Sequence, residues 1–221
     1  MFGQEVAIMA KSTVITISRQ FGSGGRLIGK KLAEKFDIPF YDRELIELAV
    51  EESGFSKEIF EKVDERASSS LLYTLSVSPG IMHGVTGMAD LPLNDKVFLV
   101  QTKIIKDVAA KGGCVIVGRC ADYILKEFHN VVNVFVRSNM NDRIERATNV
   151  YKINMNNAAK EIQKMDKKRA NYYSFYAHSK WGVAENYDLC INSGRIGIDQ
   201  SVQVIADYVE FFEAARKAHQ E

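Results

Sequence analysis

The segment VITISRQFGSGGRLIGKKLAEKF, residues 14–36, combines a strand, a glycine-rich turn and a helix in immediate succession. The β-branched run Val14–Ile17 predicts a buried strand, and the turn after it contains glycines at positions 22, 24 and 25. Apolar residues then recur at helical spacing from Leu27 to Ala33. Glycines let backbone amides approach an anion, and a helix N-terminus adds partial positive charge. The segment therefore indicates a phosphate-binding loop between a strand and a helix.

Four further β-rich runs follow along the chain, and helical patterns separate them. The runs are Pro39–Tyr41, Cys114–Val117, Val131–Val136 and Tyr187–Ile191. The helical patterns are Gly25–Phe36, Arg43–Glu52, Lys57–Ala67, Asp95–Lys111, Met140–Tyr151, Ala158–His178 and Asp199–Ala218. Strands that are apolar on both faces are typical of a sheet covered by helices on two sides. The alternation predicts an α/β fold with a five-stranded parallel sheet, in which ligands bind beyond the carboxyl ends of the strands.

The composition bounds the class of protein. A chain of 221 residues fits one domain spanning 1–221, and a formal net charge of +1 argues against binding to nucleic acid or to an acidic membrane surface. No apolar run approaches the roughly 20 residues that span a bilayer. Cys114, Cys120 and Cys190 are odd in number and scattered, which favours thiols in a reducing cytoplasm over disulfides or zinc. We expect a cytoplasmic protein with small-molecule partners. Whether it forms a homo-oligomer is left open by the sequence.

Residues 68–94 interrupt the alternation of strands and helices. This stretch, SSSLLYTLSVSPGIMHGVTGMADLPLN, is rich in serine and glycine and has no long apolar periodicity. Long irregular segments inside compact domains usually form lids or interfaces. We therefore expect a flexible insertion or a cap on the acceptor side, and a mobile surface insertion is the alternative.

The chain resembles the cytidylate kinase-like branch of the nucleoside monophosphate kinases, a family of P-loop proteins, over nearly its whole length. The matching motifs are SRQFGSGG (18–25), PFYDRELI (39–46), VGRCADYIL (117–125), DKKRANYY (166–173) and WGVAENYDLCIN (181–192). The resemblance implies a P-loop kinase-like three-layer sandwich with helices on both faces of the sheet and a short helical lid. It also implies ATP-dependent phosphoryl transfer to a nucleoside monophosphate, with ATP and Mg²⁺ as cofactors.

The phosphate loop departs from the usual pattern GxxxxGK[ST]. Ordinary cytidylate kinases carry an IDGPSGAGKGT-type loop, and matching the helices places Gly25 at its lysine, Arg26 at the glycine after it and Leu27 at its threonine. Either Arg26 or Arg19 could supply the missing cation, because a guanidinium can bind phosphate bidentately. The ATP-binding residues implied by the resemblance are Arg19, Gly22, Ser23, Gly24, Gly25, Arg26 and Leu27.

Asp42, Arg43 and Arg119 are the expected acceptor-binding residues. Asp42 and Arg43 follow the second strand, where these kinases begin to bind the acceptor, and Arg119 matches the arginine after the third strand. Asp42 is also the candidate ligand for Mg²⁺. The alternatives are structural, with Asp42 as the N-cap of the next helix and Arg119 in a salt bridge. The YR pair of ordinary cytidylate kinases is absent, so the identity of the acceptor stays open.

Residues 140–180 correspond to the helical lid hairpin of the family. Arg143 and Arg146 lie on one helical face, and Lys160–Lys180 contains six basic and two acidic residues. With Arg26, the expected catalytic residues are Arg143, Arg146 and Arg169, which would close over the transferring phosphate. The aromatic residues that follow are expected to serve mainly in packing, with base stacking by one or two at most. They are Tyr172, Tyr173, Tyr176 and Trp181.

Two other functions are compatible with the sequence. The loss of the lysine and of the serine or threonine fits a nucleotide-binding regulatory module with weak catalysis or none. Alternatively, kinase chemistry is kept and the acceptor is another small metabolite. The number of arginines expected around the cleft favours a kinase, because a binding module needs fewer of them.

Overall fold

The computed structural model describes residues 12–42 and 92–218. The helices expected at 43–52 and 57–67 lie outside the described residues, as do Arg43 and the part of the 68–94 segment before Pro92. The end of that segment is described. Pro92 immediately precedes helix α5 (Leu93–Ala110), so positions 93 and 94 are helical, and the insertion expected at 68–94 stays a prediction.

Five strands of the described chain form one parallel sheet in the order β2–β3–β1–β4–β5. The strands are β1 (Val14–Arg19), β2 (Phe40–Tyr41), β3 (Cys114–Val117), β4 (Val131–Arg137) and β5 (Leu189–Asn192). Strand β1 is central, and Val14 pairs with Cys114 on one side and with Val131 on the other. The predicted five-stranded parallel sheet is therefore confirmed.

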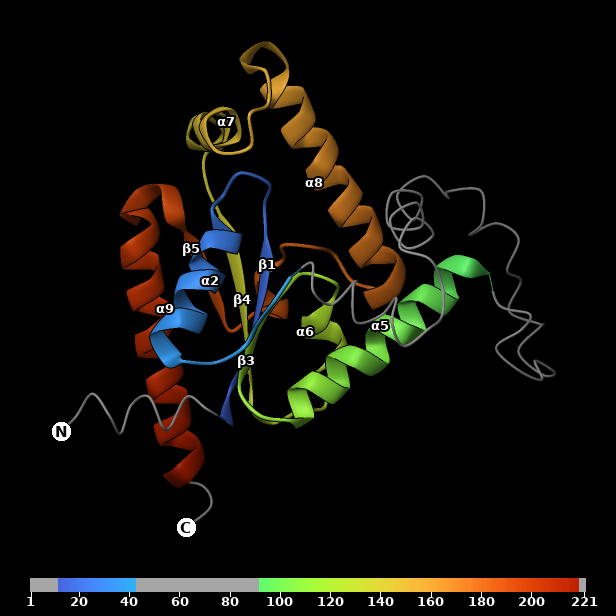
Figure 1. Ribbon diagram of the computed structural model, residues 1–221, viewed down its shortest axis with the longest axis vertical. Coiled ribbons are helices and arrows are strands. Elements are labelled where there is room, and N and C mark those ends of the chain that lie inside the picture. The colour runs from blue at the N-terminus through green and yellow to red at the C-terminus, as the bar shows by residue number, and fades with distance from the viewer. Residues whose placement is uncertain (1–11, 43–91, 219–221) are drawn as a thin grey trace.

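Helices cover both faces of this sheet (Figure 1). Helices α2 (Gly25–Phe36) and α9 (Ser193–Ala218) pack on one face, where Ile28 and Ile205 share one buried cluster with Ile17 of the central strand. Helix α5 and the short helix α6 (Ala121–Ile124) pack on the other face and form a second buried cluster. Removal of these apolar side chains from water is the main stabilising contribution to such a three-layer fold.

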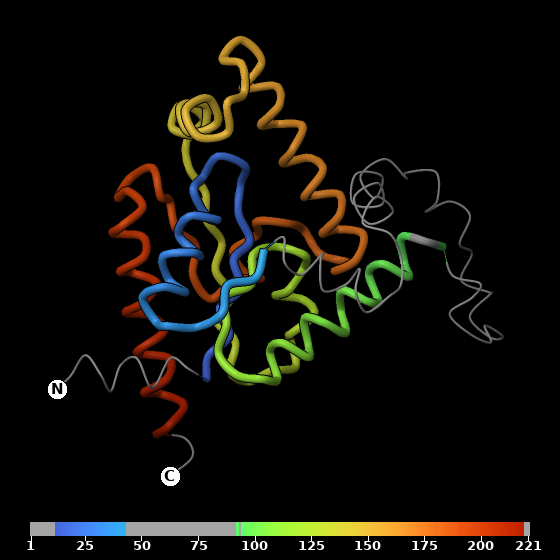
Figure 2. The backbone as a smooth tube through the Cα atoms, in the orientation of Figure 1, coloured from blue at the N-terminus to red at the C-terminus, as the bar shows by residue number. Residues whose placement is uncertain are grey.

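Helices α7 (Met140–Asn149) and α8 (Met155–Ala177) form the hairpin expected within 140–180, and they lie beyond the carboxyl ends of the strands (Figures 1 and 2). The C-terminal part of α8 is packed against the rest of the domain. Tyr176 stacks on Phe98 of α5 with 3.9 Å between the ring centroids, and Tyr173 lies in a buried cluster with Cys120. The hairpin is thus anchored at its C-terminal end.

Several element boundaries differ from the sequence-based expectation. Helix α8 begins three residues before Ala158, because the Asn154 side chain accepts a hydrogen bond from the amide of Asn156 and caps the helix there. Helix α9 begins at Ser193 but is broken at Gly197, whose φ is 80°, so its regular part agrees with the expected 199–218. Helix α6 was not predicted, since four residues are too few to show a period.

No helix within residues 12–42 and 92–218 is long and apolar enough to cross a bilayer.

We expect Ile205→Ala to lower the free energy of unfolding by about 2–5 kcal/mol, because Ile205 is completely buried between α9 and the sheet. The neighbouring Val204 is 42% exposed, so Val204→Ala is the matched control and should change stability by about 0.5 kcal/mol or less. Urea denaturation followed by circular dichroism measures both. Equal losses for the two variants would contradict the described face of α9.

Candidate active site

The turn between β1 and α2 is a compact loop that leads into the N-terminus of a helix. Strand β1 ends at Arg19, and α2 begins at Gly25 with Gly24 as its N-cap in the left-handed region (φ 85°). The buried Ser23 closes the turn, because its hydroxyl donates to the Gln20 carbonyl oxygen at 2.8 Å and its amide donates to the same oxygen at 3.2 Å. The sequence predicted this strand–turn–helix arrangement correctly.

The N-terminus of α2 offers backbone donors to an anion. Among the described residues, the amides of Gly24 and Gly25 make no hydrogen bond within the protein, and no side chain caps the helix. The first amides of a helix carry partial positive charge and bind phosphate readily. Arg26 and Leu27 stand just inside this helix, but their side chains are about half exposed, at 51% and 46%.

Three arginines of the helical hairpin bind the carbonyl oxygens of this loop. The Arg143 Nε donates to the Phe21 oxygen at 2.7 Å, and the Arg146 Nη1 donates to the Gly22 oxygen at 2.6 Å. The Arg169 Nη1 donates to the Arg19 oxygen at 2.9 Å. From the sequence, Arg143, Arg146 and Arg169 are expected at the transferring phosphate, and in the structure they bind the backbone of the loop. A catalytic role for them stays a prediction.

Asp166 of α8 completes this support of the loop. One of its carboxylate oxygens accepts from the Phe21 amide at 2.7 Å, and the other pairs with the guanidinium of the buried Arg143. The Arg169 guanidinium also lies over the Phe21 ring, 5.5 Å from its centroid. Charge-assisted hydrogen bonds are stronger than neutral ones, so helices α7 and α8 hold the loop in one conformation.

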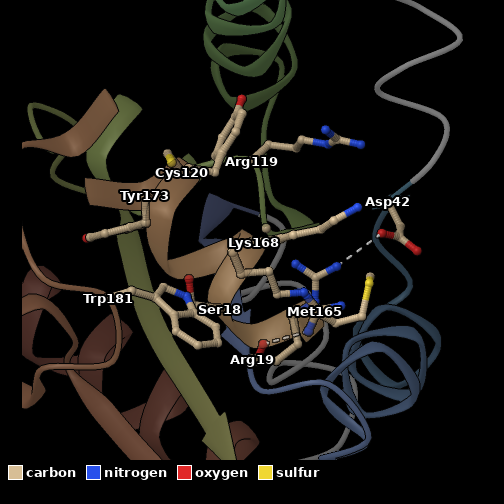
Figure 3. Close-up of a pocket in the computed structure, with 12 residues that line it drawn as sticks. Ser18, Arg19, Asp42, Arg119, Cys120, Met165, Lys168, Tyr173 and Trp181 are labelled. Atoms are coloured by element: carbon tan, nitrogen blue, oxygen red, sulfur yellow. Dashed lines mark hydrogen bonds and ion pairs between the residues drawn. The ribbon is translucent and has the colours of Figure 1, made fainter. Parts of the chain in front are cut away.

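A pocket of about 390 Å³ opens beside the loop, at the carboxyl ends of β1, β2 and β3. Its walls come from the loop, the turn after β3 and helix α8. The lining residues are Ser18, Arg19, Asp42, Gly118, Arg119, Cys120, Met165, Lys168, Arg169, Tyr172, Tyr173 and Trp181. In Figure 3 the side-chain nitrogens of Arg19, Arg119 and Lys168 extend toward the side where Asp42 lies, whereas Tyr173 and Trp181 lie on the opposite side. The pocket therefore has a cationic side and an aromatic side.

Positive charge exceeds negative charge in this pocket. Arg19, Arg119, Lys168 and Arg169 give four cations, and Asp42 is the one carboxylate among its described lining residues, so the net charge is 4 − 1 = +3. Burial and the nearby Arg169 lower the pKa of Arg19 to about 9. Burial also lowers the pKa of Arg169. Mutual repulsion of this kind favours the binding of an anion.

The turn that carries Arg119 has an uncommon backbone. Three consecutive residues, Gly118, Arg119 and Cys120, have φ values of 81°, 59° and 55°. The left-handed region costs a residue with a side chain about 1–2 kcal/mol, and such conformations cluster at functional sites. The turn places Arg119 in the wall of the pocket, where the sequence analysis expected the acceptor.

Asp42 lies between two arginines at the edge of the pocket. Its carboxylate is 2.5 Å from the Arg26 Nε and 3.8 Å from the Arg19 Nη2. Among the described residues there is no cluster of three or more His, Cys, Asp or Glu that could hold a metal ion. Mg²⁺ at phosphate sites commonly takes one or two carboxylates together with phosphate oxygens and water. The single carboxylate Asp42 would therefore fit Mg²⁺ only if phosphate oxygens and water supplied most of its ligands, and Asp42 as a metal ligand stays a prediction.

A buried polar pair that the sequence did not reveal supports the pocket. The Tyr173 hydroxyl donates to the Asp122 carboxylate at 2.7 Å, and both residues are buried. Burial raises the pKa of Asp122, and burial together with the adjacent carboxylate raises that of Tyr173. Asp122 belongs to the motif VGRCADYIL, but neither its partner nor its burial follows from that motif.

Four of the residues predicted for the site line the pocket. Arg19 and Arg119 line the pocket with Asp42, and Arg169 connects it to the loop. Leu27 and Arg26 do not line the pocket. Lys168 and Met165 were missed as lining residues. Their shared signal is helical spacing, because positions 165, 168, 169 and 172 lie on one face of α8.

A parallel sheet, a glycine-rich loop at the N-terminus of α2 and a helical hairpin above it define a P-loop kinase-like α/β fold. The family model of the cytidylate kinase-like family matches residues 14–195, so the chain belongs to that family. The resemblance inferred from the motifs is thereby confirmed, and kinase-like chemistry is the class of activity that the family supports.

Solved structures of similar fold support the same architecture. An uncharacterized protein from Eubacterium ventriosum is 29% identical, with 90% of this chain and 98% of that chain covered and a TM-score of 0.65. A shikimate kinase from Bacteroides thetaiotaomicron is 17% identical, with coverage of 90% and 98% and a TM-score of 0.52. A shikimate kinase from Acinetobacter baumannii in complex with shikimate is 12% identical, with coverage of 92% and 96% and a TM-score of 0.51. At these two lower identities the likeness shows the fold alone.

One relative with a similar sequence is named as an isomerase and not as a kinase. A uronate isomerase from Corynebacterium glutamicum is 26% identical over 147 residues, which are 66% of this chain and 28% of that protein. The chain thus spans little more than a quarter of that relative, and the name applies to the whole of the longer protein.

We expect Tyr173→Phe to lower the free energy of unfolding by about 1–3 kcal/mol, because it leaves the buried Asp122 carboxylate without its hydroxyl donor. The loss should shrink as the pH falls through the raised pKa of Asp122, since the protonated carboxyl no longer carries a buried charge. Denaturant titrations at a series of falling pH values measure this change. Tyr123→Phe is the control and should change little, because Tyr123 follows Asp122 in α6, is only partly buried and is not the hydroxyl donor to Asp122. A loss that is independent of pH would contradict the charged state of Asp122.

Proposed function

We propose that this protein transfers the γ-phosphoryl group of ATP to the phosphate of a nucleoside monophosphate. The observation that carries the proposal is the juxtaposition of an amide-lined loop with a pocket of net charge +3. ATP phosphates would bind at residues 22–26, and the acceptor would occupy the pocket. Cytidylate is the acceptor that the family suggests first.

The charges in the pocket favour a phosphate over a hydroxyl group as the acceptor. A hydroxyl needs a base to take its proton, and the carboxylate among the described lining residues, Asp42, is engaged by Arg26 and Arg19. A nucleoside monophosphate is mostly dianionic at neutral pH, because its second pKa is about 6. Such an acceptor needs no base, and four cations offset its charge.

The shape of the pocket fits a molecule with one anionic and one aromatic end. Its volume of about 390 Å³ lies within the range of small-molecule sites. The phosphate would lie at the cationic side, with Arg119 and Lys168. The base would lie at the aromatic side, where Trp181 and Tyr173 offer ring surfaces for stacking.

The transfer needs positioning and charge neutralisation more than covalent chemistry. The bond from the γ-phosphorus to ADP breaks as a bond to an acceptor phosphate oxygen forms, so ATP and a monophosphate become ADP and a diphosphate. Bound Mg²⁺ would neutralise phosphate charge, with Asp42 as its protein ligand. Arg169 lines the pocket beside the loop and would contact the moving phosphoryl group. Arg143 and Arg146 would act as positioning residues through the loop carbonyls.

A panel of acceptors with ATP·Mg²⁺ tests the proposal. We expect ADP release with one or more nucleoside monophosphates, with CMP and dCMP among them, and none with the corresponding nucleosides or with shikimate. Identification of the diphosphate product by chromatography completes the measurement. Turnover with a hydroxyl acceptor alone would favour a metabolite kinase, and binding of ATP without any turnover would favour the regulatory module.

Arg119→Ala should lower kcat/KM for the acceptor by about 10–100-fold, because it removes a charge-assisted contact to the acceptor phosphate. The KM for ATP should stay close to that of the parent. Lys103→Ala is the control, since Lys103 is 65% exposed on α5 and pairs with Asp107 outside the pocket. An Arg119→Ala variant with parental kcat/KM would remove Arg119 from the acceptor site.

A further inference from the structure

The phosphate loop differs from the GxxxxGK pattern at two positions that are six residues apart. Gly25 stands where the pattern has its lysine, and Arg19 stands where the pattern has its first glycine. A cation and a glycine are thus both present in the loop, but at each other's positions.

The two positions touch in the folded chain. A Cβ atom built on Gly25 would lie 2.6 Å from the Arg19 Cβ and 3.0 Å from its Cγ, which is closer than two carbon atoms can approach. The third neighbour, the Val136 Cβ, would be 3.3 Å away, a contact that small shifts can relieve. The stem of Arg19 therefore occupies the space that a side chain at position 25 would need.

A second glycine makes room for the other end of Arg19. A Cβ atom on Gly118 would lie 2.1 Å from the Arg19 Nη1, so the guanidinium rests directly against the backbone after β3. From there it lines the pocket, with the Asp42 carboxylate 3.8 Å from its Nη2 (Figure 3). Arg26, the other candidate, pairs with Asp42 at 2.5 Å, does not line the pocket and is 51% exposed.

We infer that the cation and the first glycine of the phosphate loop have exchanged positions in this chain. Arg19 is then the cation, and Gly25 is the glycine that makes room for it. The guanidinium of Arg19 reaches the phosphate site from the end of the strand, where a lysine would reach it from the start of the helix. It can contact two phosphate oxygens at once, unlike a lysine ammonium. The inference deepens the proposed function and rests on it for the identity of the anion.

The exchange can be reversed by mutation, and stability reports whether the two side chains share one space. Gly25→Lys alone should lower the melting temperature by about 5–10 °C, because Arg19 already fills the site. Adding Arg19→Gly should recover most of this loss. Adding Arg19→Ala should not, since alanine keeps the Cβ atom that lies 2.6 Å away. Equal melting temperatures for the two double variants would contradict the shared space.

Affinity for phosphates reports whether Arg19 is the working cation. Calorimetric titration with ATP·Mg²⁺ and with inorganic tripolyphosphate should show about 10–100-fold weaker binding to Arg19→Gly than to the parent. The Arg19→Gly/Gly25→Lys variant should regain about tenfold or more of this affinity. The affinities of Arg19→Gly and of the double variant for AMP should differ from each other far less than their affinities for ATP. A purely structural effect of the substitutions would not produce this distinction between the two ligands.

The outcomes separate the inference from the proposed function. A parent protein that binds neither ATP nor tripolyphosphate contradicts the proposed function, and the role of Arg19 falls with it. A parent that binds both, with an Arg19→Gly variant that binds equally well, overturns the inference alone. Lys103→Ala again controls for the loss of one positive charge on the surface.

Discussion

The phosphate loop depends on the hydrogen bonds between its carbonyl oxygens and the arginines of the helical hairpin. A glycine-rich turn has many accessible conformations, and only a few of them point successive amides at one anion. Here the carbonyl groups of Arg19, Phe21 and Gly22 are each bound by a guanidinium, and Asp166 binds the Phe21 amide. Because a peptide group is planar, fixing its oxygen also fixes the direction of the next N–H. The loop and the hairpin therefore form one structural unit.

The contacts around the loop also hold Arg19 and Arg169 close together, and nearby carboxylates do not fully neutralise their charges. Arg19 and Arg169 repel each other, and burial adds to the repulsion by removing water from both guanidinium groups. A group of like charges lowers the stability of the free protein, and an anion that binds among them restores it. A polyphosphate should consequently stabilise the folded chain more than an uncharged analogue of the same size.

Local patterns in the sequence revealed the fold and the loop. The strand of residues 14–17, the helix after it and the position of Arg119 after a buried strand follow from periodicity and chain order alone. The contact between Arg19 and Gly25 could not be predicted, because it depends on how β1 and the start of α2 approach each other. The hydrogen bonds of Arg143 and Arg146 to the loop carbonyls could not be predicted either. Their helical spacing predicts a shared face, and it does not distinguish a backbone carbonyl from a phosphate as the partner.

Helix α8 is anchored to the rest of the domain at its C-terminal end. Tyr173 and Tyr176 fix one end of it to α5 and to the turn after β3, so any rotation of α8 has its pivot there. Asp166 lies seven residues from Tyr173, about 10 Å along the axis at 1.5 Å per residue. Asp166 binds the phosphate loop and Tyr173 supports the wall of the pocket, so one continuous helix joins the two halves of the site.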